Sequence, residues 1–224
     1  RITQRAERLP AKRIHVIYNG YPVLEKKITT LDNKHLERMV PMGENTVVAV
    51  LVANIRPIKR IEDAVEALAS TNCPDLHLVV VGDGDTSRLE RFATELQVDR
   101  RVHFTGPRDD VQEWLAACDI GVLCSESEGF SNALVEYMQA GLPVVCSEAG
   151  GNPEAISHGE TGFLFSVGDV NTFSEHLQRL TLHPELRRAL GASARESAQR
   201  RFSMATMLSE YQNLYANKID LRRH

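Results

Sequence analysis

The residues whose types and spacing most suggest chemistry are two glutamates, Glu128 and Glu136, with seven residues between them. They lie in a segment that reads S-E-S-E-G-F-S-N-A-L-V-E-Y-M-Q-A over residues 125–140. An apolar run at residues 120–124 precedes this segment, and apolar positions recur at helical spacing in its second half. The pattern predicts a buried strand, a tight acidic loop, and a helix that begins near Ser131.

A helix that begins directly after a loop suits phosphate, because its first N–H groups lack partners and its N-terminus carries a partial positive charge. Gly129 would let a ligand approach the backbone closely, and Ser131 is a candidate N-cap. Glu128 before the helix and Glu136 inside it would then accept hydroxyl hydrogen bonds on opposite sides of a diphosphate. A sugar nucleotide has this layout of hexose, diphosphate and ribose. The candidate backbone and side-chain contacts are Gly129, Phe130, Ser131, Asn132 and Ala133.

The two glutamates also have a purely structural explanation. Carboxylates near a helix N-terminus stabilise the helix by about 0.3–1 kcal/mol each without any ligand. The loop taken alone therefore leaves ligand binding and helix stabilisation as alternatives of similar weight.

A basic loop follows the first long apolar run of the sequence. Residues 46–53 form a continuous β-branched run, as expected for a strand that is buried on both faces. The next residues, 54–60, read N-I-R-P-I-K-R and lead into a predicted helix. Arg56, Lys59 and Arg60 thus lie at the carboxyl end of a strand, where cations are placed to meet an anionic ligand. Arg can bind phosphate through paired hydrogen bonds, whereas Lys acts as a point charge.

Strand-like and helix-like segments alternate along the whole chain. This order predicts right-handed crossovers and a doubly wound, parallel α/β sheet. The predicted strands cover residues 14–18, 46–53, 76–81, 101–106, 120–124, 142–146 and 162–165. The only tryptophan, Trp114, fits the apolar stripe of a predicted helix and is expected in the core.

The totals exclude several classes of protein. The chain has 224 residues, long enough for one large α/β domain, and no apolar run approaches the length of a membrane span. With 26 basic and 30 acidic residues the net charge is −4, which argues against a general nucleic-acid binder. The four cysteines show no C-x-x-C pair, so we expect buried thiols in a cytoplasmic protein. The basic residues 1–13 are expected to form a linker, with contact to an anionic membrane as the alternative.

Four consecutive motifs resemble one enzyme family, the retaining glycosyltransferases of the GT-B fold, family four. These motifs are E-G-F-S-N-A-L-V-E, A-G-L-P-V-V, G-G-N-P-E-A-I and G-E-T-G-F-L-F, which begin at residues 128, 140, 150 and 159. The resemblance extends from about residue 11 to about residue 215. It implies that residues 14–224 form the Rossmann-like, donor-binding C-terminal half of such an enzyme, and that the N-terminal acceptor domain is absent from this chain.

The resemblance also implies a role for each acidic residue and for the basic loop. Glu128 would orient the donor sugar as the catalytic residue, and Glu136 would hold the ribose hydroxyls. Lys59 matches the family's diphosphate-binding lysine. The family's usual Gly-Arg pair, five residues before that lysine, is replaced by Ala53-Asn54. Arg56 is therefore only a candidate for the missing arginine.

Two further residues are carried over from the family with an alternative attached. Pro107 and Arg108 follow a predicted strand, at the turn that lies against the nucleotide base in the family. Arg108 is expected to contact the base, although an ordinary surface arginine explains it equally well.

The implied activity is transfer of a sugar from a nucleotide sugar, most simply a UDP-sugar, with retention of anomeric configuration. The acceptor would be a carbohydrate or a lipid-linked molecule in the synthesis of cell-surface polysaccharide or glycolipid. The family needs no cofactor. The sequence Asp83-Gly84-Asp85 follows Gly82 in a turn and is not interpreted as a D-x-D metal motif, so no metal is expected. The chain alone should bind nucleotide but transfer poorly. Two alternatives stay open, a nucleotide-sugar epimerase of related fold and a non-catalytic module that binds nucleotide sugar.

Overall fold

The computed structural model describes residues 14–22 and 34–220. The predicted linker at residues 1–13, with its membrane contact, lies outside the described residues. Clustering of contacts divides the described chain into two units, residues 34–198 and residues 14–22 with 199–220.

The larger unit is built on a six-stranded parallel sheet with the strand order β3-β2-β1-β4-β5-β6. Six of the predicted strands were right to within two residues at each end, and the largest shortening is at residues 101–106. The observed bounds are β1 (Val47–Val52), β2 (Leu76–Val81), β3 (Val102–Phe104), β4 (Ile120–Leu123), β5 (Val144–Ser147) and β6 (Gly162–Phe165). The predicted doubly wound α/β fold is therefore confirmed.

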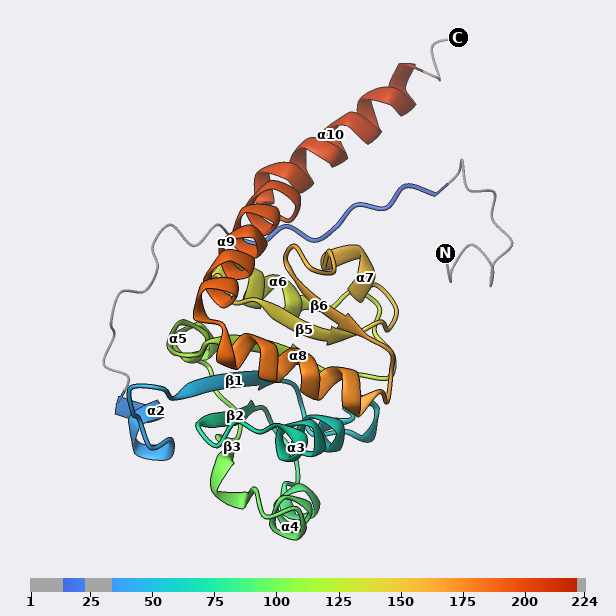
Figure 1. The fold of residues 1–224 in the computed structure, drawn as a ribbon. Helices are drawn as coiled ribbons and strands as arrows, with labels where there is room; N and C mark the ends of the chain where they lie inside the picture. Colours follow the sequence, from blue (N-terminus) through green and yellow to red (C-terminus); the bar gives the residue numbers. More distant parts are fainter. Residues whose placement is uncertain (1–13, 23–33, 221–224) are drawn as a thin grey trace. The chain divides into compact units, whose positions relative to one another are not determined.

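Helices cover both faces of the sheet, as Figure 1 shows with α8 in front of the strands and α6 behind them. In the larger unit they are α2 (Lys34–Met39), α3 (Ile61–Ser70), α4 (Ser87–Glu95), α5 (Val111–Ala117), α6 (Asn132–Ala140), α7 (Asn152–Ala155) and α8 (Val170–Leu182), with 3-10 turns at Pro57–Lys59 and Asp99–Arg101. Helix α9 (Pro184–Arg201) begins in this unit, and α10 (Met204–Asp220) belongs to the other.

Alternate strand residues supply the two layers of the core. One set packs with α3, α4 and α8 in the largest apolar cluster, where Ile120 and Val122 of β4 are buried. Successive strand residues point to opposite faces, so Gly121 faces the α6 side. A Cβ added at Gly121 would lie 2.5 Å from the ring of Tyr137, which is fully buried. Trp114 is buried as predicted.

Tyr137 also closes the gap where β1 and β4 part. The two strands pair only at Ala49 and Val50 of β1. Beyond that point the Tyr137 hydroxyl accepts a hydrogen bond from Val52 N at 2.7 Å and donates to Val122 O at 3.3 Å. One buried side chain thus satisfies two backbone groups that would otherwise lack partners. It fixes the spacing of β1 and β4 just before the loops that leave them.

The smaller unit contains the one strand prediction that was wrong. Residues 14–20 form no strand, and only Tyr21 makes an isolated bridge, to Ser203. Tyr21 N donates to Phe202 O at 2.9 Å, and the ring of Tyr18 meets the ring of Phe202 edge-on. The apolar character of residues 14–18 therefore does not reflect membership of the sheet, and Val16 is exposed.

All four cysteines are buried free thiols, as predicted. Among residues 14–22 and 34–220, no helix combines the length and the apolar character needed to cross a membrane.

Candidate functional site

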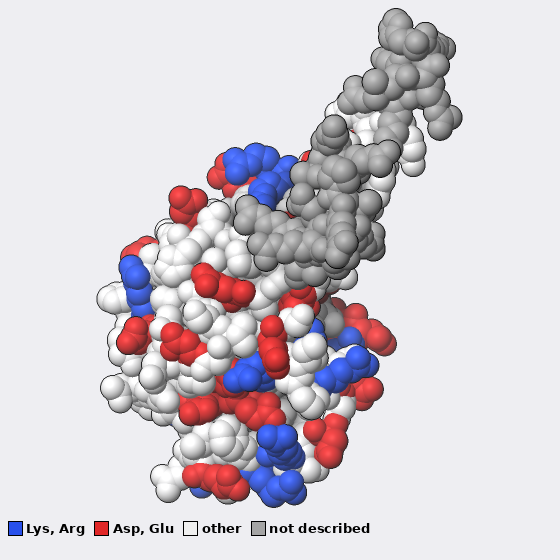
Figure 2. Space-filling view, turned by 90° about the vertical axis from the view of Figure 1, so that its right-hand side faces the viewer, with Lys and Arg blue, Asp and Glu red and all other residues white. Residues whose placement is uncertain are grey.

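The loops that carry the predicted site residues leave the carboxyl ends of β1 and β4. These are the central strands, between which the direction of the strand order reverses. In open α/β sheets ligands bind at this reversal, outside the carboxyl ends of the strands. The β1 and β5 arrows point to the right of Figure 1, and Figure 2 looks onto that side. Acidic and basic side chains are interspersed on this face and do not form separate charged patches.

Lys59 and Glu128 meet at this edge. Lys59 Nζ donates to Glu128 Oε1 at 2.6 Å, and the two side chains are only 25% and 12% exposed. The backbones that carry them are tied together, because Glu126 N donates to Ile58 O at 2.8 Å. The Cys124 thiol adds a bond to Lys59 O at 3.2 Å. Since burial raises the pKa of the Cys124 thiol, this group stays protonated and keeps its donor.

The turn after Lys59 is held by its own ion pair. Lys59 ends the 3-10 turn, and Arg60 takes a left-handed conformation with φ of 49° before α3 begins. The Arg60 guanidinium donates to both carboxylate oxygens of Asp63, at 2.7 and 3.0 Å. This contact raises the pKa of Arg60. Arg60 is therefore structural, and the side chain that reaches the centre of the site from this loop is Lys59.

The loop after β5 packs directly on the backbone of Glu128 and Gly129. Gly151 N donates to Gly129 O at 2.8 Å. A Cβ added at Gly150 would lie 1.6 Å from Glu128 O, and one added at Gly151 would lie 2.3 Å from Gly129 O. Gly150 also has a positive φ of 54°. Only glycines fit this contact, so the G-G pair sets the position of the acidic loop.

The side chains of two buried polar residues also join the loops after β4 and β5. Ser147 Oγ donates to Ser125 O at 2.7 Å, and Asn152 Nδ2 donates to Ser147 O at 3.0 Å. All three residues are essentially inaccessible to solvent. The loops after β4 and β5 therefore form one rigid support beneath Glu128.

Helix α6 begins where predicted, but its cap differs from the prediction. Ser131 occupies the N-cap position and is buried, yet its hydroxyl makes no capping hydrogen bond. The helix starts at Asn132, so the N–H groups of its first turn are presented beside Phe130 and Ser131. The nine-residue helix therefore begins where the sequence predicts it, directly after the acidic loop, and phosphate binding at its N-terminus stays a prediction.

Glu136 lies in the second turn of α6 and is half-buried. Burial raises the pKa of its carboxyl group. Within the described ranges it has no ion-pair partner that would offset this burial. An acid held in this state suits a ligand whose hydroxyl groups supply the missing donors.

The remaining predicted contact residues differ in whether their side chains already have hydrogen-bond or ion-pair partners. The Arg56 side chain is exposed, and it makes no hydrogen bond or ion pair in the part of the chain that the structure describes. Arg108 is engaged, because its guanidinium donates to both oxygens of Asp110 and lies 5.5 Å from the centre of the Trp114 ring. Pro107 beside it is exposed. Arg108 would therefore reach a base only with the part of its guanidinium that Asp110 leaves open.

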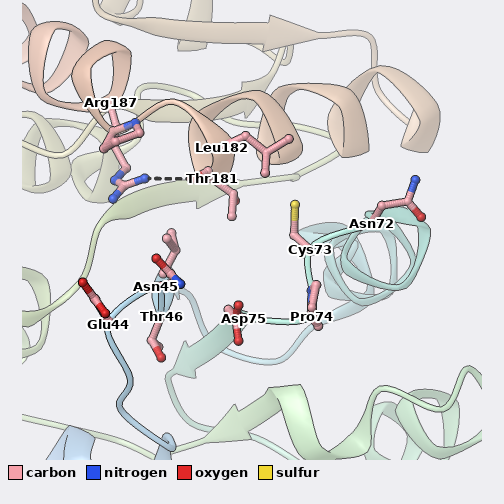
Figure 3. Close-up of a pocket in the computed structure, with 12 residues that line it drawn as sticks. Glu44, Asn45, Thr46, Asn72, Cys73, Pro74, Asp75, Thr181, Leu182 and Arg187 are labelled. Carbon is pink, nitrogen blue, oxygen red and sulfur yellow. Dashed lines mark hydrogen bonds between the residues drawn. The ribbon is translucent and has the colours of Figure 1, made fainter.

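A hollow of about 480 Å³ lies at the opposite edge of the sheet, where the strands begin (Figure 3). It is lined by Glu44, Asn45, Thr46, Val47, Asn72, Cys73, Pro74, Asp75, Thr181, Leu182, Pro184 and Arg187. Its one cation, Arg187, donates to Leu180 O and Thr181 O, while the carboxylates of Glu44 and Asp75 are exposed. A hollow with free carboxylates and an engaged cation does not suit a diphosphate, so this hollow is not the predicted site.

Groups of three or more His, Cys, Asp or Glu side chains that could hold a metal ion do not occur among the described residues. The absence of a metal requirement stays a prediction.

The sequence reasoning missed the residues that position the site. No positioning role was predicted for Gly150 and Gly151 of the G-G-N-P-E-A-I motif, or for Tyr137 and Cys124. The signal for Tyr137 was a polar hydroxyl within the apolar face of a helix, since such a hydroxyl needs a buried partner. The signal for Gly150 and Gly151 was a glycine pair directly after a buried strand.

Comparison with known proteins decides the family. The family model described as "Glycosyl transferases group 1" matches residues 34–197, well over half of the chain. This chain belongs to that family. The match includes β1 through β6 and all the predicted site residues, and it favours the glycosyltransferase interpretation over the epimerase alternative.

Individual relatives show how much of their own length is matched by this chain. It is 34% identical over 208 residues to the N-acetyl-alpha-D-glucosaminyl L-malate synthase of Bacillus anthracis, covering 92% of this chain and 54% of that protein. It is 27% identical to the UDP-Gal:alpha-D-GlcNAc-diphosphoundecaprenol alpha-1,3-galactosyltransferase of Escherichia coli, covering 92% and 55%. The Anabaena protein Alr3699/HepE, solved in complex with UDP-glucose, superposes with a TM-score of 0.80 at 27% identity, covering 92% and 58%. The chain thus spans little more than half the length of these relatives.

Proposed function

We propose that this chain is the donor-binding half of a retaining glycosyltransferase that takes its sugar from a UDP-sugar. The observation that carries the proposal is the meeting of Lys59 and Glu128 beside the start of α6. A cation, a carboxylate and a helix N-terminus converge there at the reversal point of the sheet.

The cationic side of this site would act on the leaving group. When the bond between the anomeric carbon and the diphosphate breaks, negative charge gathers on the phosphate oxygens and the sugar becomes oxocarbenium-like. Lys59, Arg56 and the N–H groups at Asn132 and Ala133 would stabilise that charge where it grows. The site thus supplies phosphate stabilisation from its own residues, and we propose that it works without a metal.

The acidic side would hold the two sugars of the donor. Glu128 would accept hydrogen bonds from hydroxyl groups of the transferred sugar and fix its orientation. Glu136 would accept hydrogen bonds from the ribose hydroxyls, as an acidic residue does in dinucleotide-binding folds. With the diphosphate held on the face from which it leaves, the acceptor would attack from that same face with assistance from a phosphate oxygen, which gives retention.

The relatives support the choice of donor and the biological setting. The Anabaena neighbour was solved with UDP and with UDP-glucose, and the Escherichia coli relative is described as using UDP-Gal and a diphosphoundecaprenol acceptor. We propose by analogy that this chain serves polysaccharide or glycolipid synthesis at the cytoplasmic side of a membrane. The acceptor would be bound by an additional domain, so the chain alone would bind UDP but transfer poorly.

Calorimetric titration of the 224-residue chain with UDP, ADP and GDP tests the proposal. We expect UDP to bind, and to bind more tightly than the purine nucleotides by about tenfold or more, because base recognition depends on hydrogen bonds that a wrong base leaves unpaired. Incubation with UDP-sugars in the absence of acceptor should give no epimerised sugar. Failure of all three nucleotides to bind, or an epimerised product, would contradict the proposal.

A further inference from the structure

The Lys59–Glu128 pair joins two groups that the proposed function assigns to different parts of the donor. Lys59 is assigned to the diphosphate and Glu128 to the transferred sugar. In the structure Lys59 Nζ donates to Glu128 Oε1 at 2.6 Å. The Glu128 carboxylate therefore offsets the Lys59 charge that a phosphate would meet, while the ammonium keeps two further N–H donors and the carboxylate a second oxygen.

The pair is part of the built site and not a chance surface contact. Exposed ion pairs contribute about 0–1 kcal/mol, because solvent screens them and long side chains lose freedom. Here Glu128 is only 12% exposed, and the two loops are joined through Glu126 N and Ile58 O and through the Cys124 thiol. A pair held on fixed backbones loses less freedom on forming and is less screened, so breaking it costs more than breaking a surface pair.

The consequence depends on what the ligand offers to each partner. A diphosphate that draws Lys59 away leaves the Glu128 carboxylate largely buried, without a donor, and near the negative charge of the phosphates. An unpaired, shielded carboxylate is costly. A sugar attached to the diphosphate offsets that cost, because its hydroxyl groups donate to Glu128. The intact sugar nucleotide offers phosphate oxygens to Lys59 and hydroxyl donors to Glu128 at the same time.

We propose, on the basis of the proposed function, that the Lys59–Glu128 pair lowers the affinity of this site for a nucleoside diphosphate relative to its sugar nucleotide. After transfer removes the sugar, the ion pair between Lys59 and Glu128 forms again, and the diphosphate loses its contact with the Lys59 ammonium. The pair thus favours release of the product and entry of a new donor.

A double-mutant cycle tests this inference with UDP as the probe. We expect Glu128→Gln to bind UDP about tenfold more tightly than the wild-type chain and to release it correspondingly more slowly, since each factor of ten is about 1.4 kcal/mol. Glu128→Ala, which also removes the carboxylate, should change affinity in the same direction. In a chain that carries Lys59→Met, the added Glu128→Gln should change UDP affinity by about twofold or less, because the cation that it frees is gone.

Two controls separate the pair from general effects. Uridine, which has no phosphate, should bind all variants about equally. Glu185→Gln removes the exposed partner of Arg188 at the start of α9 and should leave UDP affinity unchanged. Both are measured by the same calorimetric titration, and thermal unfolding of each variant confirms that it is folded.

The outcomes keep the two proposals apart. If the wild-type chain binds UDP and the Glu128 variants bind it equally or more weakly, the inference is wrong while the proposed function stands. If Glu128→Gln tightens UDP binding equally with and without Lys59→Met, simple repulsion explains it and the inference is again wrong. If the wild-type chain binds no UDP, the proposed function fails and the inference fails with it.

Discussion

Replacing Gly150 by Ala is expected to lower the free energy of unfolding by about 2–4 kcal/mol and to abolish UDP binding. The left-handed φ of 54° costs about 1 kcal/mol for a residue with a Cβ. That Cβ would lie 1.6 Å from Glu128 O, so the loops after β4 and β5 must part. Their separation loses the bond from Gly151 N to Gly129 O, worth about 0.5–1.5 kcal/mol, and displaces the Gly129 backbone that leads into the proposed phosphate site at the start of α6. Urea unfolding followed by circular dichroism measures the first effect and calorimetry the second.

Gly129→Ala is the matched control for this prediction. Among the described residues no atom lies within 4 Å of a Cβ added at Gly129, and its φ is not positive. Its free energy of unfolding should therefore stay within about 0.5 kcal/mol of the wild-type value. If UDP contacts this backbone as proposed, the added methyl group still weakens UDP binding. Equal stability of the Gly150→Ala and Gly129→Ala chains would show that the glycine pair does not support the acidic loop.

The second large effect is expected from Glu136→Ala, which should weaken UDP binding about 10–100-fold, equivalent to about 1–3 kcal/mol. The carboxylate is half-buried, and burial raises its pKa, so in the free chain its charge is poorly compensated. Removal should leave the unfolding temperature unchanged or slightly higher. If removing a side chain weakens ligand binding but does not lower the stability of the free protein, that side chain acts on the ligand itself. Calorimetry and thermal unfolding of the same samples measure the two effects.

A modified ligand sharpens the Glu136 prediction. 2′-Deoxy-UDP lacks one ribose hydroxyl, so the wild-type chain should prefer UDP over it, and Glu136→Ala should lose most of that preference. Glu66→Ala, which removes an exposed carboxylate from α3, serves as the control and should change neither affinity. Undiminished discrimination between UDP and 2′-deoxy-UDP in the Glu136 variant would remove the ribose assignment.

The sequence was enough to predict the sheet and to place Lys59 and Glu128 after its strands, at one edge. The run of β1 and the runs before the E-x7-E and G-G segments are apolar and buried, as expected for strands of a parallel sheet covered on both faces. The run at residues 14–18 is also apolar and β-branched, yet it forms no strand, and the ring of its Tyr18 meets the ring of Phe202. Local pattern cannot distinguish these cases, because pairing is a property of the tertiary fold.

The details that position the site could not be predicted in the same way. The contact of Lys59 with Glu128 joins residues that are 69 positions apart, and it depends on the adjacency of β1 and β4. Ser131 was the natural N-cap by residue type, but its buried hydroxyl does not cap the helix. Arg108 was predicted either to contact the base or to be an ordinary surface arginine, and Asp110 two residues later holds its guanidinium. In each case a tertiary or local polar contact competes with the role that residue type suggests.

The most direct test of the central claim is a titration of the isotopically labelled chain with UDP, with each backbone amide followed by NMR. The account predicts that the largest shifts occur at the edge where β1 and β4 end, at Lys59, Gly129, Asn132 and Ala133. Residues 44–47 and 72–75, which line the hollow at the opposite edge, should not shift. Saturable shifts confined to that hollow, or no shift at the start of α6 at any UDP concentration, would contradict the account.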